Sequence, residues 1–466
     1  MNLFVNNSWS GNLTATISDH MPNFLLIDNE ISKIKPKPQF KRDYKNFDEI
    51  KFVSDVKSKN LLPRNSSENL NESFEHFQNG ILSSINDYAP FKRVSKRQIK
   101  LKRKPWITSG LIKSISVKNK LYKRCLKSKD MFWYQRYKYY RDTLNHLIRK
   151  SKRIFYKDFF DNCITDFKKV WKGINDLLSK SSKKKSDEIS LKIGNKVISN
   201  KNTVANHFNS FFTSIAEELV SKLGKTSKKF TDYLNKPQNN SLFLNPVAEY
   251  EVSDQINKLN EKKSADTYDI PVKLIKMIKD QITGPLTELI NISFTTGCCP
   301  EILKYAKVIP IYKANSPMDV KNYRPISILP IFNKIMEKLM HERVISFLEK
   351  NNVIFNHQFG FQKNKSTTLA ILDLQTKIIE AIEKKHFSCC IFLDFAKAFD
   401  TVDHEILLKK LEYYGIRGIA LDWFHSYLKG RKQSVVVGGE MSETLNINYG
   451  VPQGIVLGPS LFLIYI

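Results

Sequence analysis

The sequence predicts an α+β fold that follows a basic helical connector. From about Val247 onward, short apolar runs bounded by Pro and Gly mix with longer runs of helical spacing, which predicts strands and helices in one domain. Residues 91–178 show helical spacing with many positive charges, and the Lys/Ser-rich residues 179–186 and the polar residues 236–241 separate this part from the rest. An apolar content of 41% is ordinary for globular proteins and excludes a wholly disordered chain.

These composition changes predict four segments along the 466 residues. Residues 1–30 form short alternating runs, and residues 31–90 form a polar connector with one helix near residues 74–88. Residues 91–245 form a basic helical linker region, and residues 246–466 form the α+β domain.

The charge of the chain is one-sided, with a formal net charge of +29. Residues 91–160 contain 23 Lys and Arg against 3 Asp and Glu, so this stretch alone carries +20. Such an excess indicates a polyanionic partner. Nucleic acid is favoured over an anionic membrane because six aromatic residues that could stack on bases lie among the charges: Trp106, Trp133, Tyr134, Tyr137, Tyr139 and Tyr140.

The cysteines and the apolar runs indicate an intracellular protein. The six cysteines include the adjacent pairs Cys298-Cys299 and Cys389-Cys390, which do not have the spacing of a zinc site, so we expect reduced thiols. Residues 1–7 lack the basic start and apolar core of a signal peptide. The most apolar run, residues 454–466, is too short to span a bilayer. We therefore expect no membrane partner and a location in the nucleus, the cytoplasm or both.

Five local patterns define the α+β domain. Residues 307–313 and 323–329 are predicted strands around a turn at residues 314–319, which makes a hairpin. Residues 332–350 have the apolar spacing of a packed helix. Residues 388–394 are predicted to be a buried strand that ends at Asp394, and residues 405–413 a helix that Asp400 and Asp403 start and cap. Residues 450–454 predict a rigid turn ahead of an apolar helix.

A carboxylate at a strand end can hold a metal ion, but Asp394 alone cannot fix the two ions of a two-metal phosphoryl-transfer site. No second candidate carboxylate follows Gly454. Taken alone, Asp394 is also compatible with a turn or a helix cap. In the same way, Lys313 and Arg324 could be surface cations, and Phe399 could be an ordinary core residue.

The order of two motifs resembles the reverse transcriptases of non-LTR (LINE-type, jockey-like) retrotransposons. These motifs are FLDFAKAFD at residues 392–400 and YGVPQG at residues 449–454. The resemblance is dense over residues 250–466 and loose over residues 95–180. It implies an incomplete right-hand polymerase, with fingers and a partial palm, that performs RNA-directed DNA synthesis by two-metal nucleotidyl transfer. The implied cofactor is a pair of Mg²⁺ ions, and the implied partners are an RNA template, a DNA primer or target, and deoxynucleoside triphosphates.

The resemblance also assigns roles to individual residues. Asp394 would be the catalytic metal ligand, helped by the backbone carbonyl of Phe395. Lys313 and Arg324 would clamp the triphosphate. The ring of Phe399 would block a ribose 2′-hydroxyl, and Gln453 and Gly454 of the turn would make the remaining nucleotide contacts.

Nucleic-acid contacts are implied at two further places. The resemblance implies that Lys363 and Lys365 would lie near the template strand, although Gln362 stands where the jockey-like enzymes usually have Arg. The segment before the polymerase contributes three more candidates: Arg103, Lys104 and Trp106.

The resemblance implies that a Tyr/Phe-x-Asp-Asp hairpin should follow residue 454, and this hairpin is missing. We therefore expect a truncated chain that is inactive as it stands. The first thirty residues resemble the end of an apurinic-type endonuclease, in which Asp19 would orient His20 near the scissile phosphate. An alternative remains open, namely a non-enzymatic nucleic-acid-binding remnant of a decayed element, which the departure at Ile455 also fits. A structural helical scaffold does not explain why Asp394 and residues 450–454 occur together. The oligomeric state is left open.

Overall fold

The computed structural model describes residues 8–12, 23–27, 40–62, 69–94, 104–128, 130–163, 166–178, 189–222, 230–234, 237–261 and 265–466. The chain divides into two compact units. The smaller unit contains Met1–Arg42 and Phe91–Lys152, and the larger unit contains Asp43–Pro90 and Arg153–Ile466. The four segments predicted from composition stay a prediction.

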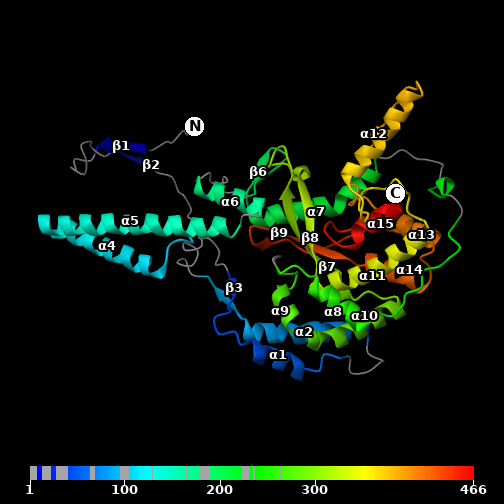
Figure 1. Cartoon of the computed structure of the whole chain (residues 1–466), viewed down its shortest axis with the longest axis horizontal. Helices are drawn as coiled ribbons and strands as arrows, with labels where there is room; N and C mark the ends of the chain where they lie inside the picture. Colours follow the sequence, from blue (N-terminus) through cyan, green and yellow to red (C-terminus); the bar gives the residue numbers. More distant parts are fainter. Residues whose placement is uncertain are drawn as a thin grey trace. The chain divides into compact units, whose positions relative to one another are not determined.

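The smaller unit is built around two long helices, α4 (Ser109–Ser128) and α5 (Met131–Asp161), of which α5 continues into the larger unit. Figure 1 shows the two helices side by side, and the rings of Tyr122 and Tyr137 meet at 5.1 Å between them. Asp130 begins α5 because its Oδ1 accepts a hydrogen bond from the N–H of Phe132 at 3.0 Å. Two short antiparallel pairs complete the unit: β1 (Ser8–Asn12) with β2 (Asn23–Ile27), and β3 (Phe40–Arg42) with β4 (Phe91–Arg93).

A mixed sheet forms the centre of the larger unit, in the order β10-β9-β7-β8 with β11 also paired to β9. The predicted hairpin is confirmed as β7 (Tyr305–Tyr312) and β8 (Tyr323–Ile328), joined through η3 (Val320–Asn322). Its antiparallel register runs from Lys307 opposite Ile328 to Tyr312 opposite Tyr323. The strand order places β8 at the edge of the sheet. Parallel to β7 lies β9 (Lys432–Val437), followed by β10 (Glu440–Met441) and β11 (Leu445–Asn446).

Helices cover this sheet and bury its apolar side chains. Figure 1 shows α7 (Lys201–Val220) lying against the sheet, and Asn209 of α7 donates a hydrogen bond to the carbonyl of Gln433 in β9 at 3.4 Å. The core is rich in aromatic rings: Phe77 of α2 (Leu70–Tyr88) meets Phe332 of α11 (Ile331–Lys350) at 5.1 Å. The other helices and short elements are α1 (Glu49–Ser58), α6 (Phe167–Leu177), β5 (Leu191–Ile193), β6 (Lys196–Ile198), η1 (Phe230–Tyr233), α8 (Glu249–Asn257), α9 (Val272–Met277), α10 (Lys279–Thr296), η2 (Glu301–Leu303), α12 (Thr367–Glu383), α13 (His404–Tyr413), α14 (Ile419–Leu428) and α15 (Leu457–Tyr465).

The structure contradicts one predicted element, the buried strand at residues 388–394. Residues 386–395 have no helix or strand, and Ile391, Phe392 and Leu393 are each 82% exposed. A strand needs a neighbour that pairs with its N–H and C=O groups, and no strand of the described chain pairs with this segment. The mixture of helices and strands predicted for the domain, the helix at residues 405–413 and the free thiols are confirmed. Among the described helices, none has the length and apolar character needed to cross a membrane.

Candidate functional site

The two sequence motifs lie together in space. The N–H of Gly450 donates to the carbonyl of Val402 at 2.7 Å, and the N–H of Val451 donates to the carbonyl of Phe399 at 2.8 Å. The Nε2 atom of His404 hydrogen-bonds the carbonyl of Gly450 at 2.8 Å. Gly450 has φ +79°, and a Cβ atom there would lie 2.8 Å from the carbonyl oxygen of Asp400, so only glycine fits this approach.

Gln453 connects this turn to the edge of the sheet and to Asp400. Its carbonyl accepts the N–H of Ser327 in β8 at 2.9 Å. Its side-chain Nε2 donates to Oδ1 of Asp400, also at 2.9 Å. Burial raises the pKa of Asp400, while the bond from Gln453 and the charge of Lys397 act in the opposite direction. Both side chains line a cavity with a water-accessible volume of about 30 Å³, which also touches Ser327 and Tyr449.

The hairpin places the two predicted triphosphate ligands on one face. Ile311 and Arg324 are cross-strand partners, so their side chains share a face, and Lys313 lies two residues beyond Ile311 on the same side. The N–H of Lys313 donates to the carbonyl of Asn322 at 2.8 Å, which continues the pairing past the strand end. Lys313 and Arg324 are both exposed, so both cations can reach a ligand.

Gly454 lies beside this hairpin. It has φ +102°, and a Cβ atom there would come within 3.8 Å of the Ile326 side chain and 3.5 Å of the Ser327 carbonyl. Ile326 is two residues from Arg324 and so lies on the cation-bearing face, whereas Pro325 and Ser327 line the cavity with Asp400 and Gln453. The two faces of β8 therefore present different groups to the turn.

Asp394 and Phe395 lie in the exposed segment that lacks strand partners. Within the described ranges, no group of three or more His, Cys, Asp or Glu side chains could hold a metal ion. Magnesium requires several oxygen ligands, and two ions require carboxylates on both sides. The described residues therefore do not by themselves fit a two-magnesium centre, and the role of Asp394 as a metal ligand stays a prediction.

Phe399 is half-buried between two other rings. It meets Phe361 edge-on at 6.0 Å and Phe462 of α15 at 5.0 Å, and it packs against the apolar core. This position combines packing with partial exposure, so its proposed action on a ribose 2′-hydroxyl stays a prediction.

The structure locates four of the seven remaining predicted residues. Lys363 is exposed, whereas Lys365 donates to the carbonyl of Asn356 and lies 5.4 Å from the centre of the Phe359 ring. Lys104 is exposed, and Trp106 is half-buried with the Nζ of Lys152 5.3 Å from its ring centre. Arg103, Asp19 and His20 lie outside the described residues.

Several aromatic residues of the smaller unit are already engaged with neighbours. The guanidinium groups of Arg124 and Arg136 lie 4.5 Å and 5.8 Å from the centre of the Trp133 ring. Tyr137 packs on Tyr122 and lies under Arg141. Of the six aromatic residues predicted to stack on bases, Tyr134 and Tyr139 are exposed, and Tyr139 is 76% exposed.

Sequence reasoning misassigned Asp400. Asp403 caps α13, because its Oδ1 accepts the N–H of Ile406 at 3.0 Å, as predicted. Asp400 instead accepts from Gln453, which lies 53 residues away along the chain. The sequence did contain a signal: Asp400 lies three residues before Asp403, which stands directly before the helix and is the better N-cap, so Asp400 was free for another role.

Sequence reasoning also missed Glu337. Its buried carboxylate accepts the N–H of Val456 at 2.8 Å, the hydroxyl of Tyr427 at 2.7 Å and the amide of Asn333 at 2.6 Å. These bonds anchor the residue where α15 begins, directly after the turn. An acidic residue within the apolar stripe of α11 was the signal that could have found it.

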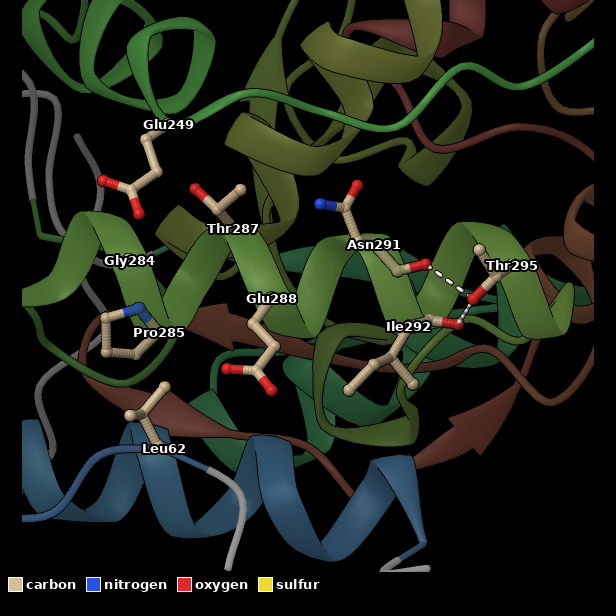
Figure 2. Close-up of a pocket in the computed structure, with 9 residues that line it drawn as sticks. All are labelled: Leu62, Glu249, Gly284, Pro285, Thr287, Glu288, Asn291, Ile292 and Thr295. Atoms are coloured by element: carbon tan, nitrogen blue, oxygen red, sulfur yellow. Dashed lines mark hydrogen bonds between the residues drawn. The ribbon is translucent and has the colours of Figure 1, made fainter. Parts of the chain in front are cut away.

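A larger cavity, of about 550 Å³, lies along α10. Figure 2 shows its lining side chains spread along this helix, with Glu249 and Leu62 contributed by neighbouring segments. Asn291 is committed to the backbone of Val247 at 2.7 Å and 3.0 Å, and Thr295 to carbonyls of its own helix. No motif residue lines this cavity, so we place the candidate site at the turn instead.

Known proteins are similar to this chain in the same region. Residues 311–466 match the family described as reverse transcriptase (RNA-dependent DNA polymerase). The chain is 25% identical over 467 residues to the probable RNA-directed DNA polymerase from transposon BS of Drosophila melanogaster, covering 96% of this chain and 49% of that protein. It is 34% identical over 239 residues to the RNA-directed DNA polymerase from mobile element jockey of the same species, covering 51% and 26%.

A third relative is the probable RNA-directed DNA polymerase from transposon X-element of Drosophila melanogaster, 30% identical over 241 residues, covering 50% of this chain and 26% of that protein. The chain thus spans about half the length, or less, of these relatives. Residues 311–466 are thus similar to a reverse transcriptase domain, and the relatives that the chain resembles are named as RNA-directed DNA polymerases of mobile element jockey, transposon BS and transposon X-element.

Proposed function

We propose that this chain supplies the fingers and part of the palm of a right-hand polymerase that copies RNA into DNA for a non-LTR retrotransposon. One observation carries the proposal. Residues 399–404, the turn at residues 449–454 and strand β8 are joined by direct backbone hydrogen bonds, although they are far apart in sequence. Nucleotide candidates from all three segments therefore surround one small region.

Lys313 and Arg324 bind the triphosphate in this proposal. Their shared face and their exposure support the role, and the planar guanidinium of Arg324 can grip two phosphate oxygens at once. Gly454, next to the same face, lets the backbone approach the nucleotide closely. Phe399 limits the space at the ribose 2′ position, and Lys363 and Lys365 contact the template strand.

Asp394 contributes one carboxylate to the metal centre of the complete enzyme. Two Mg²⁺ ions, when bound, would neutralise charge on the transferred phosphate and activate the primer 3′-hydroxyl. The second carboxylate comes from a strand that pairs with residues 388–393. Support for this pairing is the exposed apolar run Ile391, Phe392 and Leu393, whose backbone groups pair with no other strand of the described chain.

The smaller unit holds the nucleic acid. Its support is the charge of residues 91–152, which contain 21 Lys and Arg against 2 Asp and Glu, together with the exposed rings of Tyr134 and Tyr139. Lys104, Trp106 and Arg103 are further nucleic-acid contacts in this proposal. The proposal includes action in the nucleus, the cytoplasm or both, and an endonuclease remnant at residues 1–30 with Asp19 and His20.

A second function is a nucleic-acid-binding protein without catalysis. The observation that favours it is the absence of a metal-ligand cluster among the described residues. The two functions differ in one property, because only the polymerase needs to bind a deoxynucleoside triphosphate.

Nucleotide binding therefore tests the proposal. The full chain is bound to a DNA primer on an RNA template, and the affinity for the matched deoxynucleoside triphosphate is measured. The double variant Lys313→Ala, Arg324→Ala should lose at least about tenfold in affinity, because each charged hydrogen bond is worth about 1.5–3 kcal/mol. The control variant Lys350→Ala, Lys429→Ala, which removes two exposed cations elsewhere, should bind as the parent does. Primer–template binding without nucleotide binding would favour the second function.

A further inference from the structure

The side-chain amide of Gln453 has a defined orientation. Its Nε2 donates to Oδ1 of Asp400 at 2.9 Å, and an ionised carboxylate can only accept. The structure thus places the NH₂ end towards Asp400, and the Oε1 end points away from it. Gln453 is half-buried, and its Oε1 has no hydrogen-bond partner within the part of the chain that the structure describes.

Asp400 is itself fixed against the turn that carries Gln453. A Cβ atom on Gly450 would lie 2.9 Å from the Asp400 Cα, so the two backbones touch. The neighbouring carbonyls of Phe399 and Val402 accept the N–H groups of Val451 and Gly450 on either side. The cavity at this point has room for about one or two waters, so solvent competes little with the bond.

We propose that Asp400 is a positioning residue that orients the Gln453 amide so that its oxygen is presented to the nucleotide as a hydrogen-bond acceptor. The inference rests on the proposed function, because it takes Gln453 as a nucleotide contact. It adds the chemistry of recognition: the group that Gln453 binds is a donor, either a sugar hydroxyl or a base amino group. Asp400 does not touch the nucleotide in this account.

The first experiment observes the Gln453 amide without any nucleotide. The full chain is labelled with ¹⁵N in its glutamine side chains, and Gln453→Leu identifies the Gln453 resonance. Asp400→Ala should speed exchange of the Nε2 protons about tenfold, whereas Asp400→Asn should keep it within about twofold, because its Oδ1 still accepts. Asp403→Ala is the matched control, since it removes the cap of α13 but no bond to Gln453. Unchanged exchange in folded Asp400→Ala would overturn the proposal.

The second experiment exchanges donor and acceptor and measures nucleotide affinity on the primer–template complex. Gln453→Glu opposes two carboxylates and should weaken the affinity more than tenfold. Adding Asp400→Asn restores a donor opposite the new carboxylate and should recover at least threefold. A double variant as weak as Gln453→Glu alone would refute the positioning role. Both substitutions preserve side-chain size.

Nucleotide analogues separate the two donor sources. If a sugar hydroxyl is the donor, the affinity for the analogue without the 3′-hydroxyl should no longer depend on Asp400. If a base amino group is the donor, the affinity for analogues without that amino group should no longer depend on Asp400. A parent chain with a protected amide but no nucleotide binding would refute the proposed function and leave the Asp400–Gln453 interaction standing.

Discussion

The buried charges around Tyr427 give a prediction whose size can be worked out from the structure. Glu337 and Arg431 are both fully buried, and Tyr427 connects them: its hydroxyl donates to Glu337 at 2.7 Å, and the Arg431 guanidinium lies 4.8 Å from its ring centre. Arg431 donates from Nη1 to the Tyr427 carbonyl, while its Nε and Nη2 have no partner in the described chain. Burial raises the pKa of Glu337, and the charge of Arg431 opposes that rise.

Removing one of the two charges should leave the other without compensation. Glu337→Gln should therefore lower the free energy of unfolding by about 1–3 kcal/mol, because an amide cannot accept all the hydrogen bonds that Val456, Tyr427 and Asn333 donate to the carboxylate. Arg431→Met should also destabilise the protein. The double variant should cost less than the sum of the singles by about 1–3 kcal/mol, because neither charge then remains buried alone.

Urea unfolding measures this coupling, and Trp423 provides a local fluorescence signal because its buried ring stacks on Tyr427 at 5.2 Å. The exposed pair Lys222–Glu218, 2.6 Å apart, is the matched control and should show a coupling below about 0.5 kcal/mol. Additive effects of Glu337→Gln and Arg431→Met, within about 0.5 kcal/mol, would refute the reasoning.

Three further predictions concern nucleic acid, sugar selection and pH. Replacing Lys113, Lys138, Arg149 and Lys150 of the smaller unit with Gln should flatten the log–log salt dependence of nucleic-acid binding by about 0.7–0.9 for each phosphate that the protein no longer neutralises; an unchanged slope would place the binding surface elsewhere. In an enzyme completed with the rest of the palm, Phe399→Ala should admit ribonucleotides in a primer-extension assay. Removing the ring from between Phe361 and Phe462 costs at most about 3–5 kcal/mol, so the variant is first checked for folding. If the folded variant still rejects ribonucleotides, Phe399 is a core residue only. Burial lowers the pKa of His404 in the folded protein. At a pH near the ordinary pKa of histidine, the unfolded chain therefore binds more protons than the folded one, so His404 should lower the free energy of unfolding as the pH falls from about 7.5 to 5.5. His404→Gln keeps a donor for Gly450 but does not titrate, so urea unfolding should show a smaller decrease in stability over this range, and an equal decrease would contradict the assignment.

Sequence patterns predicted the parts of the fold that depend on neighbouring residues. The β7–β8 hairpin followed from apolar runs on either side of a turn, and α13 from its cap at Asp403. The apolar run at residues 388–394 has the same local appearance as a buried strand, but strand formation depends on a partner that local sequence does not reveal. Strand prediction failed there for that physical reason.

The candidate site was predictable residue by residue but not in its connections. Lys313 and Arg324 were recognisable as cations on a hairpin, and the register now shows their common face. The bond between Asp400 and Gln453 joins two residues that lie 53 positions apart, so it depends on tertiary structure that local sequence does not reveal. Glu337 was hidden by the helical pattern around it, since periodicity reports which face is buried and not which buried residue binds a distant backbone group.

The most direct test of the central claim is templated primer extension with Mg²⁺ by a protein in which residues 1–466 continue into the palm of a jockey-type relative. We expect deoxynucleotide incorporation that depends on the RNA template, and a decrease of at least about a thousandfold in Asp394→Asn with primer–template affinity nearly unchanged, because the carboxylate acts on the reacting phosphate and not on duplex binding. Residues 1–466 alone should incorporate no nucleotide. Template-dependent incorporation by Asp394→Asn at the parental rate, or by residues 1–466 alone, would contradict the account.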